Sequence, residues 1–188
     1  MKTLPLIIFA IAAVGQWAAP LSQLWTHEQT LTKGTLIKLK CSAPDPYDPL
    51  RGRYLAVRPE QQSVTVPKGM ELPKNNTPVY AVLTTGVDGL TTATSLSLTP
   101  PTSGAYIRMK AGMNFLSSTV GSVNITWPFE RFYINEKLAP EADKWFAENI
   151  RSDKGIIAEV RVLKGRAVLA DLSLDGKSFR EILKERVK

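Results

Sequence analysis

Apolar and polar residues alternate along short stretches through most of the chain. Between Thr35 and Cys41, every second side chain faces one way, while Lys38 and Lys40 face the other. This period of two is typical of a half-buried β-strand. The same period predicts strands over residues 54–58, 63–66, 78–85, 90–99, 106–110 and 123–127, and a hairpin of residues 156–163 and 166–174 around Lys164 and Gly165.

Two stretches show a helical period instead. Pro140 suits the first position of a helix, and Ala142, Trp145, Phe146 and Ile150 form its apolar stripe. Near the C-terminus, Ser178 and Glu181 have the spacing of a capping box, and the expected inner face is Phe179, Ile182, Leu183 and Val187. We therefore predict a β-rich α+β fold: a mixed or antiparallel sheet, with a barrel-like form as one option, and two helices packed on it.

The N-terminal stretch from Leu4 to Trp25 contains no charged residue. About 22 residues are enough to cross a bilayer as a helix. We expect residues 1–26 to form one transmembrane signal anchor, contacting lipid through residues 4–25, residues 27–34 to form a tether, and residues 35–188 to form one domain. A cleaved signal peptide is the alternative, but the stretch is long for one and no small-residue cleavage site precedes a polar start.

Two blocks stand apart from the alternating pattern. Residues 42–57 contain three prolines within six residues, which exclude a helix or a central strand, and Asp45 and Asp48 each precede a proline as turn-forming residues do. Residues 127–142 begin with tryptophan, two phenylalanines, tyrosine and arginine within seven positions. Aromatic residues with arginine are typical both of cores and of interface hot spots.

These two blocks resemble the GDYXXLXY membrane-protein family. Gly52 and Tyr54 match the name motif, whereas Arg53, Val57 and Pro59 replace its Asp, Leu and last Tyr. The motif and structural positions are Asp45, Tyr47, Asp48, Arg51, Gly52, Arg53 and Tyr54. The resemblance implies a single-pass protein of the bacterial inner membrane whose β-rich domain lies outside the cytoplasm, and it implies no defined activity.

The composition narrows the possible chemistry. Cys41 and His27 are the only residues of their types, which argues against an intramolecular disulfide, a zinc site or a nucleophilic triad. The alternation predicts that Cys41 is a small buried residue. The formal net charge is +7, and for a domain outside the cytoplasm nucleic acid is not an expected partner. No metal or cofactor is predicted.

Three functions remain open. The first is a non-enzymatic accessory or interaction protein of the envelope, which binds a membrane protein through Arg131, Tyr133, Asn135 and Glu136. This interface assumes that Phe132 and Ile134 are buried and their neighbours exposed. The second is a hydrolase using Asp45 or Asp48 with Glu130. The third is a β-barrel that binds a small molecule or lipid.

Overall fold

The computed structural model describes residues 4–42, 54–71, 73–112, 121–135, 138, 140–142, 144–145 and 155–186. Its elements are α1 (Leu4–Lys33), β1 (Thr35–Ser42), β2 (Tyr54–Ala56), β3 (Arg58–Pro59), β4 (Ser63–Thr65), β5 (Pro78–Thr85), β6 (Thr91–Ser97), β7 (Tyr106–Ala111), β8 (Ser122–Thr126), β9 (Arg131–Tyr133), β10 (Ile156–Leu163), β11 (Arg166–Leu174), β12 (Lys177–Ser178) and α3 (Phe179–Arg186). Residues 140–142 and 144–145 are also helical.

The described strands form three sheets. One has the order β12-β11-β10-β1-β3, another β4-β8-β7-β5-β6, and β2 and β9 form a two-stranded sheet. Every ladder between these strands is antiparallel. The antiparallel option is therefore confirmed, and the barrel-like option stays a prediction.

One apolar core joins the sheets. The alternation predicted for residues 35–41 places Ile37, Leu39 and Cys41 in this core, as period-two strands with one buried face require. At the other end of the chain, Phe179 and Leu183 of α3 are fully buried against it. Val187, the fourth residue of the predicted inner face, lies outside the described residues.

The predicted transmembrane segment is wrong. No helix in the part of the chain that the structure describes is long and apolar enough to cross a membrane. The helix α1 spans 30 residues, and polar Gln16, Ser22 and Gln23 interrupt its apolar residues. The residues expected to form a tether, from His27 onward, continue the same helix up to Lys33.

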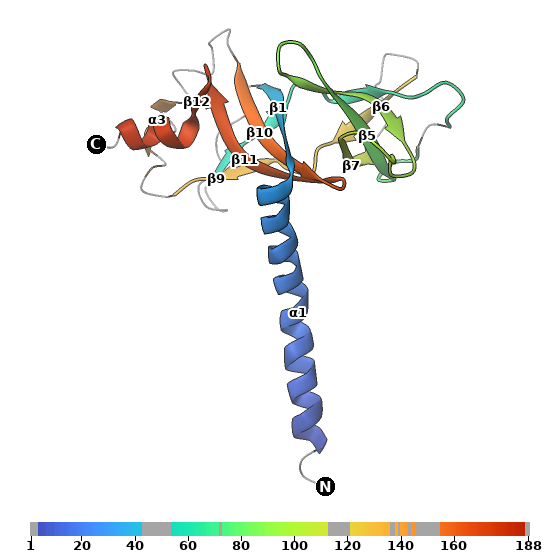
Figure 1. Ribbon diagram of the computed structural model, residues 1–188, viewed down its shortest axis with the longest axis vertical. Helices are drawn as coiled ribbons and strands as arrows, with labels where there is room; N and C mark the ends of the chain where they lie inside the picture. The colour runs from blue at the N-terminus through green and yellow to red at the C-terminus, as the bar shows by residue number, and fades with distance from the viewer. Residues whose placement is uncertain are drawn as a thin grey trace.

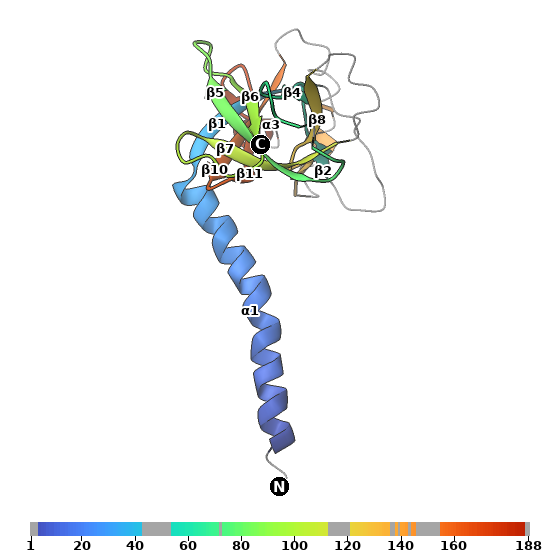
Figure 2. The same ribbon diagram turned by 90° about the vertical axis from the view of Figure 1, so that its right-hand side faces the viewer.

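The helix α1 projects from the sheets, as Figures 1 and 2 show, with the N-terminus at its far end. Along this projection Phe9, Val14 and Trp17 are exposed. At its end, the Gly34 amide donates to the Thr30 carbonyl of the last turn at 3.0 Å. A Cβ on Gly34 would lie closest to the Thr30 carbonyl oxygen and 3.0 Å from the Val162 nitrogen of β10. Glycine is needed there because both the carbonyl of the last helical turn and the backbone of β10 leave no room for a side chain.

Candidate functional site

The aromatic block that begins at Trp127 carries the most distinctive side-chain arrangement. Trp127, Phe129 and Phe132 are buried, whereas Tyr133 is 67% exposed. The indole nitrogen of Trp127 donates to the Gln61 carbonyl at 2.7 Å, and its ring lies 5.8 Å from that of Phe129. The buried aromatic residues thus fix the block in the core and present Tyr133 at the surface.

The exposure of residues 131–135 follows the predicted alternation. Phe132 is buried and Ile134 is half-buried, while Tyr133 and Asn135 are exposed and Arg131 is intermediate. A period of two places neighbouring side chains on opposite faces of a strand. Arg131, Tyr133 and Asn135 therefore lie on the outer side of the block, and Glu136 lies outside the described residues.

An open cleft of about 740 Å³ runs beside this block. We call it the β9–β11 cleft, because residues 127–133, which include β9, form one wall and Ala167–Leu169 of β11 form another. His27 of α1 and Arg180 of α3 complete the lining. The cleft thus joins side chains from four distant parts of the chain.

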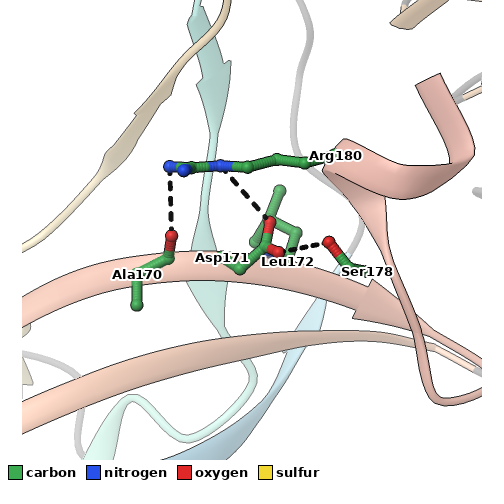
Figure 3. A network of polar contacts seen from close by, with 5 residues as sticks. All are labelled: Ala170, Asp171, Leu172, Ser178 and Arg180. Carbon is green, nitrogen blue, oxygen red and sulfur yellow. Dashed lines mark hydrogen bonds and ion pairs between the residues drawn. The ribbon is translucent and has the colours of Figure 1, made fainter. Parts of the chain in front are cut away.

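Arg180 lines the cleft, and its side chain reaches from α3 to the Ala170 carbonyl and to Asp171 of β11 (Figure 3). Its Nη2 atom donates to the Ala170 carbonyl at 3.2 Å, and its Nε atom lies 3.9 Å from Asp171 Oδ1. Its guanidinium carbon also lies 5.6 Å from the centre of the Phe132 ring, a cation–π contact. These contacts hold a positive charge between the two walls.

Asp171 organises the start of α3. Its Oδ2 atom accepts a hydrogen bond from the Ser178 hydroxyl (Figure 3), and its Oδ1 atom accepts one from the Leu172 amide at 2.9 Å. The sequence predicted that Ser178 would cap α3 together with Glu181. The Ser178 hydroxyl donates to Asp171 of β11 instead, so this part of the helix start depends on a neighbouring strand.

The predicted motif block lies mostly outside the described residues. Asp45, Tyr47, Asp48, Arg51, Gly52 and Arg53 belong to this undescribed stretch. Tyr54 begins β2 and pairs along the backbone with Tyr133 of β9, in the register Tyr54↔Tyr133, Leu55↔Phe132 and Ala56↔Arg131. The described end of the first block, β2, and β9 of the second block are therefore adjacent strands.

The structure does not test the hypothesis of a hydrolase that uses carboxylates. Glu130 is exposed on the cleft wall, and its proposed partners Asp45 and Asp48 lie outside the described residues. Among residues that the structure does describe, no cluster of three or more His, Cys, Asp or Glu side chains could hold a metal ion.

Cys41 is buried in the core, as predicted. Burial raises the pKa of its thiol to about 12, with a smaller raising effect from the Glu60 charge and a lowering effect from a backbone hydrogen bond with Ala158. Because the thiolate is the nucleophilic form, Cys41 is inert at neutral pH.

Sequence reasoning missed three parts of the cleft. His27 was expected in a tether, Arg180 was not among the residues named for the C-terminal helix, and Ala167–Leu169 were expected only in a hairpin strand. No local sequence signal marks these residues as lining a cleft, because the cleft forms only when separate elements of the chain pack together.

A model of the GDYXXLXY protein family matches residues 16–172 of the chain. The matched range includes both family-like blocks and all of β9, β10 and most of β11. No curated protein and no solved structure matches the chain.

Proposed function

The chain belongs to the GDYXXLXY protein family, and we propose that it is a non-enzymatic accessory protein that binds a partner protein through the face carrying Arg131, Tyr133 and Asn135. The observation that carries this proposal is Tyr133, which is 67% exposed although Phe132 beside it is fixed in the core. A rigidly held, exposed tyrosine next to an arginine is the composition of interface hot spots.

The surroundings of Tyr133 also favour binding. Phe132 packs against Phe179 with ring centres 6.0 Å apart, and Phe179 packs against Trp145 at 4.8 Å. Because this aromatic cluster holds β9 in place, presenting Tyr133 to a partner costs little conformational entropy. The adjoining β9–β11 cleft gives a partner a concave surface.

A photo-crosslinking amino acid in place of Tyr133 tests the proposal. Crosslinks should form to one specific protein from the native source. The matched control carries the same amino acid at Val87, a fully exposed residue in the turn between β5 and β6. Equal products from both positions, or none from position 133, would overturn the proposal.

Two alanine variants separate binding from folding. Tyr133→Ala should weaken partner binding by about 2 kcal/mol and change the unfolding free energy by less than about 0.5 kcal/mol. Phe132→Ala should lower the unfolding free energy by about 3–5 kcal/mol, because it removes a buried ring. A Tyr133→Ala variant that binds the crosslinked partner as tightly as the original chain would contradict the interface.

A small-molecule binder is the second candidate, since the cleft volume of about 740 Å³ lies within the usual range of ligand sites, about 300–1,000 Å³. A screen of metabolites by thermal shift would favour it if a compound stabilised the original chain but not Arg180→Gln.

The envelope location stays a prediction, which fractionation of the native cells would test.

A further inference from the structure

We propose that the partner inserts an extended, acidic segment into the β9–β11 cleft, where it adds as a strand to the edge of β11 at Ala167–Leu169. This inference rests on the proposed function, since it names how the partner would be held. Three observations support this inference: the strand pairing of β11, the direction of the backbone groups of β11 and the charge of the cleft.

Among the strands that the structure describes, one edge of β11 is only partly paired. On one side, β10 pairs with β11 from Arg166 to Ser173. On the other side, β12 pairs only with Ser173 and Leu174. Near the opposite end, the Arg108 amide of β7 donates to the Gly165 carbonyl at 2.8 Å. Between these contacts, no described strand pairs with this side of Ala167–Leu169.

The hairpin geometry directs backbone groups into the cleft. Lys164 and Gly165 both have positive φ, 49° and 80°, as a two-residue type I′ turn requires. Leu163 and Arg166 then form the first hydrogen-bonded pair. Hydrogen-bonded and non-hydrogen-bonded pairs alternate along an antiparallel ladder, so Ala167 and Leu169 occupy non-hydrogen-bonded positions opposite β10. Their amide and carbonyl groups therefore point away from β10.

These two residues line the cleft, so each offers one donor and one acceptor to an added strand. Such an edge is a template for an extended peptide, in which main-chain hydrogen bonds provide affinity and side-chain contacts provide specificity. The next carbonyl along the edge, that of Ala170, already accepts from Arg180. Arg180 therefore marks one end of the available edge.

Charge determines the kind of segment that fits. At neutral pH the lining carries two positive side chains, Arg131 and Arg180, and one negative side chain, Glu130. The side chain of Arg180 is 65% exposed, so a carboxylate on the inserted segment can reach its guanidinium. Arginine binds carboxylates through charge-assisted hydrogen bonds. The fitting segment is thus extended and carries an Asp or Glu near Arg180.

The probe is an array of synthetic heptapeptides in which Val and Thr alternate and one Glu is moved through the positions. Matched arrays carry Gln or Lys in place of Glu. We expect Glu peptides to bind the full chain, and bound peptide to slow hydrogen exchange at the amides of Ala167 and Leu169. N-methylation of the peptide backbone should abolish binding, because it removes the donors of an added strand.

Arg180→Gln should weaken binding of the Glu peptide about tenfold and leave the Gln peptide nearly unchanged. The matched control is Arg166→Gln, on the same strand but outside the cleft lining, which should bind both peptides as the original chain does. Thermal unfolding of both variants verifies that they are folded.

The absence of any binding in the array at about 1 mM peptide, or equal binding of Lys and Glu peptides, would overturn the proposal. So would binding that survives N-methylation. A partner that crosslinks at position 133 but leaves the exchange of Ala167 and Leu169 unchanged would overturn strand addition alone, and the proposed binding face would remain. If position 133 captures nothing, the proposed function itself fails.

Discussion

Replacing Gln61 by glutamate tests how the sheet containing β6 is fastened to the core. The Gln61 side chain acts as a short substitute strand beside β6: its Nε2 atom donates to the Ala93 carbonyl at 2.7 Å, and its Oε1 atom accepts from the Ala93 amide at 2.8 Å. The same Nε2 atom lies 3.2 Å from the Ser63 carbonyl. One side chain therefore satisfies both backbone groups of a buried residue.

The change Gln61→Glu keeps the shape of the side chain and removes its donor. A carboxylate oxygen then faces the Ala93 carbonyl, so the hydrogen bond is replaced by a repulsion. A net hydrogen bond contributes about 0.5–1.5 kcal/mol, and a buried group left without a partner costs about 1–3 kcal/mol. We expect a loss of about 2–3 kcal/mol at pH 7, which lowers the Tm by roughly 5–10 °C for a chain of this size.

The loss should depend on pH in a defined direction. A protonated glutamic acid can donate to the Ala93 carbonyl, so folding raises the pKa of the introduced group above its ordinary value of about 4.3. The folded variant then holds its proton more tightly than the unfolded one. Stability is retained below about pH 4.3 and is lost as the pH rises through the folded pKa.

Thermal and urea unfolding of the variant and the original chain at pH 4 and pH 7 provide the measurement. The difference in unfolding free energy should be small at pH 4 and complete at pH 7. Gln62→Glu is the matched control, because the Gln62 side chain is exposed and should show no such difference. Equal stability of Gln61→Glu and the original chain at pH 7, or a pH-independent loss, would refute the role given to this side chain.

Other predictions concern the hairpin turn and the cysteine. Gly165→Ala should lower the unfolding free energy by about 1–3 kcal/mol, since φ is +80° and the new Cβ would lie 2.8 Å from Tyr106 Cε2. Gly176→Ala, where φ is +77° and no atom lies within 4 Å, should lower the unfolding free energy less. Equal losses of the two variants in urea unfolding would contradict the clash with Tyr106. Cys41 should resist alkylation at pH 8 in the folded chain and react in denaturant, because burial raises its pKa to about 12; rapid labelling of the folded chain would contradict this. Since the folded thiol holds its proton more tightly, its contribution to stability should be lost as the pH rises from about 9 toward 12, and Cys41→Ala should lack this part of the pH dependence in unfolding titrations.

Several elements could be predicted because their signals are local. The alternation at Ile37, Leu39 and Cys41 gave the buried face of β1, and the Lys164–Gly165 pair gave the hairpin turn. Alternation also gave the correct phase for Phe132 and Tyr133. In each case, the decisive information lies within a few neighbouring residues, where backbone geometry fixes which side chains share a face.

The N-terminal segment shows where local reasoning failed. Counting uncharged residues from Leu4 to Trp25 predicted a transmembrane helix followed by a tether. The helix instead continues to Lys33, and in the described part of the chain no helix is long and apolar enough to cross a membrane. Gly34 directly after the helix is a local stop signal, but its close approach to β10 depends on the tertiary structure and cannot be read from the local composition.

The sequence by itself determined which faces of the strands are apolar, and with them the β-rich class of the fold. Only the tertiary structure decided which strands are neighbours: it placed Tyr54 beside Tyr133 and brought His27 and Arg180 to one cleft. The physical reason is that a period of two specifies a buried face but not a pairing partner, since any apolar face can pack on any other. Partners are selected by the packing of the whole core.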